Sequence, residues 1–263
     1  MTEFRALMDS MTQTADGLAI TVSEDWLQGR TVYGGLGAAL CLQAAQRQFG
    51  DLPPLRSAQI SFIGPASGEL KLAPVELRRG KSTVFVGVDL CGESGLATRA
   101  TFCFGAGRAS KVAFAATPAT QLRKPEFCPT FFDHAPPHLR FLQHVEGRNA
   151  GGAFPFSGAK DPMMTLWLRH RDTSLKPSLV PLLALADAPP PAIVAMLTAP
   201  GLISTMTWSI DLLTDTIDTT DGWWLIRTEA DAAADGYTSQ VMTVWNASGQ
   251  AVMTSRQNVA VFG

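Results

Sequence analysis

An aspartate ends an apolar segment in the second half of the chain. Residues 178–188 are predicted to form a short helix that stops before three consecutive prolines, and Asp187 lies in its last turn. The negative pole of the helix dipole lies at that end, so an acidic residue is unfavourable there and a function would explain it. A carboxylate near buried surface can have a raised pKa and act as a general base or orient a water. An ordinary residue of a C-terminal turn is the alternative.

Polar side chains, two of them hydroxyls, alternate with apolar ones along residues 207–212. In a strand, Thr207, Ser209 and Asp211 would share one face, with Trp208 and the apolar residues on the other. Hydroxyls on an inward face could hold a water or a substrate carbonyl. A face turned to solvent gives the same alternation and is the commoner case.

Gln257 lies midway along the last predicted strand. Its amide can donate and accept hydrogen bonds at once, which suits the positioning of a water. An exposed glutamine on an edge strand would give the same sequence pattern.

A glycine pair precedes the most apolar helix of the first half. Residues 26–47 combine an aromatic and glycine turn with a segment rich in leucine and alanine, which predicts a helix buried on nearly every side. The amides of Gly34 and Gly35 would lack partners within that helix and could polarise a carbonyl. The alternative is that the glycines only allow a tight turn. Tyr33, Gly34, Gly35 and Thr207 are the candidate substrate-binding residues.

The elements needed to position these residues follow the same order twice. In the first half, a helix or strand at 4–11 and a strand at 17–22 precede the apolar helix, and strands follow at 55–63, 69–79, 82–90 and 95–104. In the second half, strands at 139–146 and 164–171 precede the short helix, and strands follow at 205–213, 223–230, 236–246 and 250–262. The repetition predicts two tandem α+β units, each with a helix packed against a curling antiparallel sheet.

Proline, alanine, lysine and threonine dominate the stretch between the two units, which is typical of a connector. The predicted boundaries are a first domain at residues 1–108, a connector at 109–137 and a second domain at 138–263. Phe127, Phe131 and Phe132 indicate that the connector lies on the folded surface.

Composition excludes several classes of protein. Hydrophobic residues make up 46% of the 263 residues, charged residues 17%, and the formal net charge is −2, so disorder and general attraction to nucleic acid are not expected. The four cysteines form no C-x-x-C pair and are expected to be reduced thiols in the cytosol. No targeting or membrane-spanning segment is expected, and the sequence has no nucleotide or serine-hydrolase motif. The four histidines have no metal-ligand spacing, so surface or loop positions are expected for them, and neither metal nor cofactor is predicted.

The chain resembles the TesB-like acyl-CoA thioesterases with two fused hotdog domains. The resemblance rests on four motifs: WLQGRTVYGG at 26–35, LRSAQISFIGP at 55–65, ALAD at 184–187 and TSRQ at 254–257. It implies a double hotdog fold, with two helix-wrapped sheets joined edge to edge. It also implies hydrolysis of an acyl thioester by a water held among an Asp, a hydroxyl residue and a Gln, without a required covalent intermediate.

The resemblance assigns these catalytic roles to Asp187, Ser209 and Gln257, with Thr207 as the alternative hydroxyl. Backbone amides at a helix start, with Gly34 and Gly35 as candidates, would stabilise the oxyanion. Two positions depart from the family pattern. Ser209 stands where threonine is usual, and Leu212 replaces the histidine that often follows the strand's aspartate.

The leading hypothesis is therefore an acyl-CoA thioesterase of fatty acid metabolism, with an apolar acyl tunnel between the halves. The alternative is a non-catalytic protein of the same fold that binds acyl-CoA or acyl carrier protein thioesters. A hydratase or dehydratase ranks below both, because no His/Asp or His/Glu pair occurs at the helix positions that such chemistry needs. A homo-oligomer is expected, since hotdog sheets expose edges.

Overall fold

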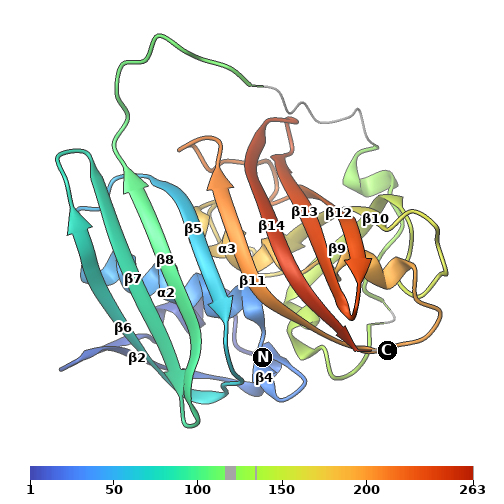
Figure 1. Cartoon of the computed structure of the whole chain (residues 1–263), viewed down its shortest axis with the longest axis horizontal. Helices are drawn as coiled ribbons and strands as arrows, with labels where there is room; N and C mark the ends of the chain where they lie inside the picture. Colours follow the sequence, from blue (N-terminus) through green and yellow to red (C-terminus); the bar gives the residue numbers. More distant parts are fainter. Residues whose placement is uncertain (116–122, 134, 263) are drawn as a thin grey trace.

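The computed structural model describes residues 1–115, 123–133 and 135–262, and its main feature is a single twelve-stranded antiparallel sheet (Figure 1). The strand order is β1-β2-β6-β7-β8-β5-β11-β14-β13-β12-β10-β9. The strands of the first half are β1 (Thr12–Thr14), β2 (Gly17–Val22), β5 (Leu55–Phe62), β6 (Gly68–Arg79), β7 (Thr83–Gly92) and β8 (Gly95–Gly105). Those of the second half are β9 (Val145–Gly152), β10 (Met163–His170), β11 (Leu202–Leu212), β12 (Trp224–Ala234), β13 (Tyr237–Asn246) and β14 (Ala251–Phe262).

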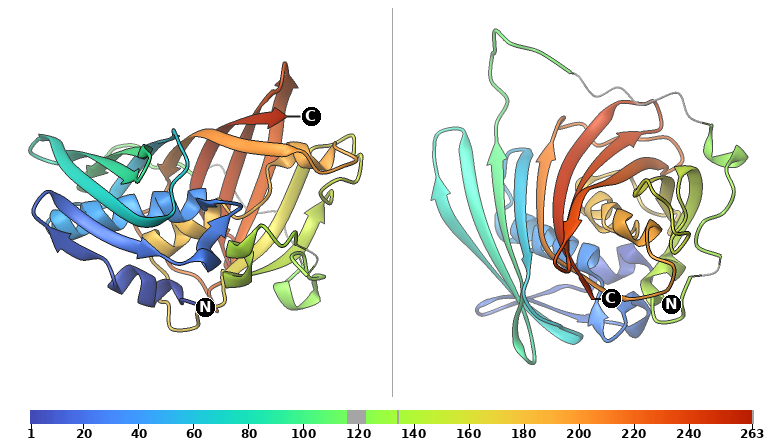
Figure 2. Two further views of the ribbon diagram at one scale, coloured as in Figure 1. Left: turned by 90° about the horizontal axis from the view of Figure 1, so that it is seen from below. Right: turned by 45° about the vertical axis from the view of Figure 1, so that its right-hand side comes forward.

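The two halves meet where β5 pairs with β11. The pairing is antiparallel and places Ile60 opposite Trp208, so each half contributes one contiguous block of strands. Helix α2 (Gly34–Gln48) lies against the first block and helix α3 (Leu179–Ala186) against the second. The strands of the second block curve around α3 (Figure 2). The predicted tandem arrangement of two α+β units is confirmed.

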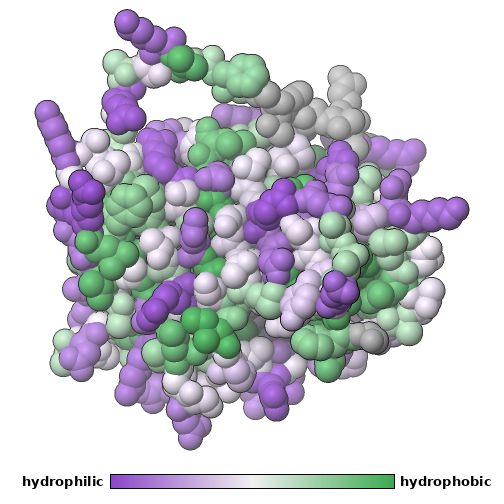
Figure 3. Space-filling view, viewed as in Figure 1, coloured by the Kyte–Doolittle hydropathy of each residue, from purple (hydrophilic) through white to green (hydrophobic). Residues whose placement is uncertain are grey.

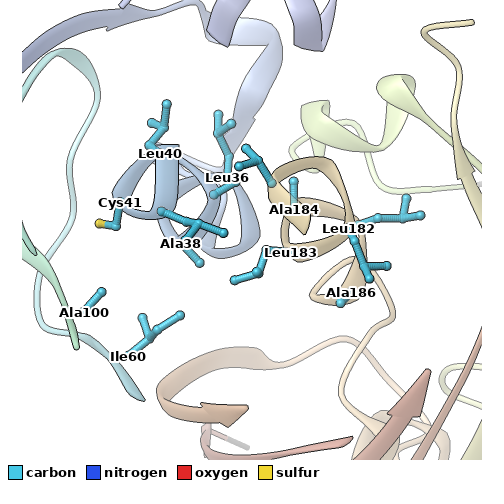
Figure 4. Packing of buried hydrophobic residues seen from close by; sticks show 14 of the residues in the cluster. Leu36, Ala38, Leu40, Cys41, Ile60, Ala100, Leu182, Leu183, Ala184 and Ala186 are labelled. Atoms are coloured by element: carbon cyan, nitrogen blue, oxygen red, sulfur yellow. The ribbon is translucent and has the colours of Figure 1, made fainter. Parts of the chain in front are cut away.

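Helix α2 is buried almost throughout, as its small residues predict. Ten of its fifteen residues are buried, and it packs side by side with α3 (Figure 4). Leu36 and Ala38 face Leu183 and Ala184 across the helix pair, while Ile60 and its neighbours cover α2 from the sheet. The two helices therefore share one apolar core that continues across the seam between the halves.

The start of α2 comes closest to α3. A Cβ atom on Gly35 would lie 2.5 Å from the carbonyl oxygen of Ala184 and would also meet the Tyr33 hydroxyl. The Tyr33 hydroxyl donates a hydrogen bond to that same carbonyl, and its ring stacks on Phe141 with centroids 3.9 Å apart. Glycine at position 35 is thus required by packing, in addition to any chemical role.

Minor elements complete the chain. They are α1 (Phe4–Asp9), the two-stranded sheet of β3 (Leu27–Gln28) and β4 (Thr31–Val32), and the 3₁₀ helices η1 (Glu24–Trp26), η2 (Pro125–Phe127), η3 (Arg140–His144) and η4 (Ala192–Ala195). Within the described residues, none of the helices combines the length and the apolarity needed to cross a membrane.

The strand predicted at 139–146 is only partly right. Residues 140–144 form η3, and the strand begins at Val145. The 3₁₀ turn buries the adjacent side chains of Phe141 and Leu142, which a strand would place on opposite faces.

The surface position predicted for all four histidines is wrong for two of them. His144 is 5% exposed, stacks on Trp26 with centroids 3.8 Å apart, and lies 3.2 Å from an Asp25 carboxylate oxygen. His170 contacts the carbonyl of Pro181 through Nε2 at 2.8 Å. His138 is exposed, and His134 lies outside the described residues.

The aromatic residues of the connector do not all pack as expected. Phe131 and Phe132 lie partly buried against the core, and Thr130 forms a β-bridge with Arg148. Phe127 is 69% exposed. This part of the connector therefore belongs with the sheet of the second half.

The contact between the two helices predicts that Gly35→Ala is destabilising. The new methyl group would meet backbone of α3, which cannot move aside, so we expect a loss of roughly 2 kcal/mol. For a chain of this size, that corresponds to a fall in Tm of about 4–8 °C. Gly37→Ala is the matched control, because its Cβ would meet only Thr98 Oγ1, at 3.5 Å. Equal Tm values for the two variants would contradict this account.

Candidate functional site

Asp187 caps the C-terminal end of α3. Its backbone has left the helical conformation, with φ −89° and ψ 0°, and the next residue's amide donates back to the carbonyl of Leu185. The prolines at 189–191 prevent the helix from continuing. The carboxylate is partly buried and stands at the negative end of the α3 dipole, where that helix does not favour its charge.

The start of α2 offsets this unfavourable position. The backbone N–H of Gly35 donates a hydrogen bond to the Asp187 carboxylate. A Cβ on Gly34 would lie 2.8 Å from Asp187 Oδ2 and 3.3 Å from the ring of Phe62. The carboxylate therefore rests against the positive end of the α2 dipole, which only a backbone without side chains could approach so closely.

Gln257 supplies the second hydrogen bond to the carboxylate. It lies on β14, is 2% exposed, and donates from Nε2 to Asp187 Oδ1 at 2.6 Å. Its carbonyl Oε1 accepts from Gln240 Nε2, also at 2.6 Å. The structure thus brings together Asp187, Gln257, Gly34 and Gly35, which come from three elements far apart in the sequence.

The surroundings of Asp187 bring the pKa of its carboxyl group close to neutral pH. Burial raises the pKa of the carboxyl group to about 7, although the hydrogen bonds from Gln257 and Gly35 act to lower it. At neutral pH the group exists in both protonation states. A carboxylate with this pKa can take a proton from a bound water at physiological pH.

The predicted hydroxyl residues lie elsewhere. Ser209 pairs across strands with Arg256, both are exposed, and Thr207 is exposed on the same face of β11. Figure 3 shows this exposed face of the sheet as a mixture of hydrophilic and hydrophobic side chains. The assignment of Ser209 or Thr207 to the water-holding site is therefore corrected: the alternation was right, but the hydroxyl face is the solvent face.

Trp208 occupies the inward position where a hydroxyl was expected. It pairs with Gln257 across the strands and is completely buried. Within the described part of the chain, its indole N–H has no hydrogen-bond partner. On the buried side, β11 therefore presents a ring N–H beside Gln257 in place of a hydroxyl.

Tyr33, a predicted substrate-binding residue, is buried and its hydroxyl group already has a partner within the protein. It is 2% exposed, and its hydroxyl is occupied by the carbonyl of Ala184. Burial and the nearby charge of Asp187 both raise the pKa of Tyr33, so it stays neutral. Tyr33 holds the start of α2 to the end of α3 and so keeps Asp187 on the glycine amides.

Gln240 is the site residue that the sequence reasoning missed. It is 1% exposed on β13, and it pairs across strands with Gln257. The sequence contained one indication of this residue. Gln240 alternates with Thr238 and Met242 along one face of its strand, and that face points inward.

A cavity of about 600 Å³ lies at the opposite end of the helix pair. Its walls include Phe49 and Leu52 from the first half and Leu179 and Leu212 from the second. Neither Asp187 nor Gln257 lines it, and the expected acyl tunnel stays a prediction. No cluster of three His, Cys, Asp or Glu side chains suited to a metal ion occurs among the residues that the structure describes.

The hydrogen bonds to Asp187 predict a titration that NMR can follow. With ¹³C-labelled aspartate, the carboxyl signal that disappears in Asp187→Asn should titrate with a midpoint near 7. Gln257→Leu removes a donor that stabilises the carboxylate, so the midpoint should rise. Gln59→Leu, on the exposed face of β5, should leave it unchanged. A midpoint near 4 in the unmodified protein would contradict the described environment.

Comparison with known proteins places this geometry in a family. The model of the acyl-CoA thioesterase N-terminal domain matches residues 22–105, and that of the acyl-CoA thioesterase C-terminal domain matches residues 125–261. A search of curated proteins found no match.

Solved structures of similar fold cover nearly the whole chain. A conserved hot dog fold protein of unknown function from Alicyclobacillus acidocaldarius is 23% identical, with a TM-score of 0.85 over 97% of this chain and 98% of its own. The tesB protein of Mycobacterium avium subs paratuberculosis is 16% identical, with a TM-score of 0.78 over 98% of each chain. The acyl-CoA thioesterase II TesB2 of Mycobacterium marinum is 17% identical, with a TM-score of 0.74 over 97% of each chain.

These likenesses confirm the double hotdog fold, and the two family models together span most of the sequence. The chain belongs to the acyl-CoA thioesterase family, with an N-terminal and a C-terminal thioesterase domain in tandem.

Proposed function

We propose that the protein hydrolyses acyl-CoA thioesters with Asp187 as the general base. The observation that carries this proposal is the contact of Asp187 with Gln257 and the Gly35 amide, which hold in place a carboxyl group whose pKa burial raises to about 7. Family membership supports thioesterase chemistry and an acyl-CoA substrate.

In the proposed reaction, the ionised Asp187 takes a proton from a water as the water oxygen attacks the thioester carbonyl carbon. The tetrahedral intermediate then collapses, the carbon–sulfur bond breaks, and the departing thiolate takes the proton back from Asp187. The products are a carboxylic acid and the free thiol of coenzyme A. Gln257 keeps the carboxylate oriented toward the water throughout.

The start of α2 is the proposed oxyanion site. Of the two central helices, α2 begins beside Asp187, whereas α3 begins at the other end of the pair. The amides of Gly34 and Leu36 flank the Gly35 amide that donates to Asp187, and all three precede the first helical hydrogen bond, in which Gly37 donates to Tyr33. An oxyanion near them would meet N–H donors and the positive end of the dipole.

The non-catalytic alternative is supported by one observation. Ser209 and Thr207, the hydroxyl residues that the family resemblance implies, lie on the exposed face of β11, and Trp208 stands on the buried side beside Gln257. A protein with this site could bind an acyl thioester without placing the water well enough to hydrolyse it. Cytoplasmic location and assembly into an oligomer stay predictions.

Hydrolysis assays across a series of acyl-CoAs test the proposal. Asp187→Asn should lose at least about 100-fold in kcat/KM, because it removes the general base. Gln257→Ala should lose roughly 10- to 100-fold, the value of a hydrogen bond to a charged group. Ser209→Ala should stay within about twofold of the unmodified protein, since its side chain faces solvent.

Thermal shifts would verify that each variant is folded. If Asp187→Asn retains the full rate, the general-base role is wrong. If no acyl-CoA is hydrolysed but some raise the Tm, the binding-protein alternative replaces the enzyme.

The raised pKa of Asp187 predicts the pH dependence of the reaction. The base works only when ionised, and its pKa lies at about 7, so kcat/KM should rise with pH and level off above about 8. Below pH 6, the rate should fall about tenfold for each pH unit. A flat profile between pH 5 and 8 would show that Asp187 does not supply the base.

A further inference from the structure

We propose that Gln240 is a positioning residue that fixes which end of the Gln257 amide faces Asp187. The proposal concerns the hydrogen-bonding direction of buried glutamines, and its effect on rate rests on the proposed function. The side chain of Gln240 bonds Ala192 and Gln257, so its link to Asp187 runs through Gln257.

The direction is set at one end by a backbone amide. Ala192 donates its N–H to Gln240 Oε1 at 2.8 Å, and a backbone N–H can only donate. This forces the oxygen of Gln240 toward Ala192 and its NH₂ group toward Gln257. Gln257 must then accept with Oε1, at 2.6 Å, and present its own NH₂ group to Asp187.

The other end of the chain of hydrogen bonds agrees with this direction. The ionised Asp187 only accepts hydrogen bonds, so it also requires the NH₂ group of Gln257. Rotating either glutamine amide would bring two donors or two acceptors together. Because Gln240 and Gln257 are 1% and 2% exposed, water has little access to relieve such a mismatch.

Ala192 belongs to the same segment as Asp187. After Asp187 the prolines carry the chain back to the sheet, where η4 begins at Ala192 and packs against β10 and β12. The residues Asp187, Gln257, Gln240 and Ala192 therefore close a ring between one loop and two neighbouring strands. The loop that ends α3 sets the orientation of the group that holds its own aspartate.

The corresponding strand of the first half shows what packing alone requires. The buried face of β7 carries Val84, Val86 and Val88, whereas that of β13 carries Thr238, Gln240 and Met242. Valine fills this layer of the sheet without a buried amide. Burying the amide of a glutamine at this position costs desolvation free energy. The hydrogen bond to Gln257 is the interaction that offsets this cost.

The Asp187 carboxyl titration, measured by ¹³C NMR, tests the proposal without relying on turnover. Gln240→Met keeps the size of the side chain but removes its bond to Gln257, which leaves that amide free to rotate. The midpoint of Asp187 should rise by roughly half a pH unit or more. Thr238→Val is the matched control, since Thr238 is 2% exposed on the same strand face and bonds the carbonyl of Ala232. It should not move the midpoint.

A double variant separates positioning from general damage. In a Gln257→Leu background, Gln240→Met should cause no further rise in the midpoint, because Gln240 acts through Gln257. An equal rise in both backgrounds, or no rise in the unmodified one, would overturn the proposal. If Gln240→Met does not fold, Gln240→Leu serves instead, because it also removes the donor to Gln257 and adds no charge near Asp187.

Kinetics distinguish this proposal from the proposed function. Gln240→Met should lower kcat/KM more at pH 6 than at pH 9, with KM unchanged. If the unmodified protein hydrolyses no acyl-CoA but the midpoint rises in Gln240→Met, the positioning role stands and the enzymatic role fails. If hydrolysis occurs and neither the midpoint nor the pH profile changes, the positioning role fails alone.

Discussion

The close approach of one helix start to another helix end determines the rest of this structure. Helix α2 begins where α3 ends, so the positive pole of one dipole meets the negative pole of the other. Tyr33 bonds the last turn of α3, and Gly35 has no space for a side chain. With Gly34 and Gly35 at this point, the amides of α2 reach the carboxylate that caps α3. The same contact packs the two halves together and forms the candidate site.

Asp187 is held in a balance between opposing contributions. Burial and the end of α3 favour its neutral form, while the Gly35 amide and Gln257 favour its ionised form. Burial outweighs the two donors and raises the pKa to about 7, well above the usual value of an aspartate. A fully solvated carboxylate would be too weak a base, and one buried without donors would stay protonated. The balance depends on a polar chain that continues through Gln240 to Ala192 and leaves each buried amide with a partner.

Much of the fold followed from local sequence patterns, but the site depended on contacts that such patterns do not contain. The small residues of 34–48 predicted a buried helix, and the turns predicted the four strands that follow each central helix. Asp187 and Gln257 were singled out separately, yet their hydrogen bond spans 70 residues. Ser209 was misplaced because alternation defines two faces without saying which one is buried, and Trp208 took the inward position.

Gln240 was missed for a related reason. Counting outward from the turn between β13 and β14 would pair it with Arg256, but the register shifts by one residue between Val244 and Trp245. That shift moves Gln257 opposite Gln240. His144 was expected in a surface loop because a single sequence does not show that Trp26 covers its ring.

The two halves are joined by the antiparallel pairing of β5 with β11. As a result, the end of the helix pair where α3 stops is equivalent to the opposite end, where α2 stops. At one end, α3 terminates in Asp187, and at the other, α2 terminates in Phe49 beside the cavity of about 600 Å³. The last strands differ in the same sense, since β8 buries Phe102 opposite Val86, where β14 buries Gln257 opposite Gln240. In a dimer of identical single units, any substitution would appear at both ends. Joining the two units in one chain removes that constraint. A substitution at one end of the helix pair then leaves the other end unchanged, so the two ends can differ in sequence.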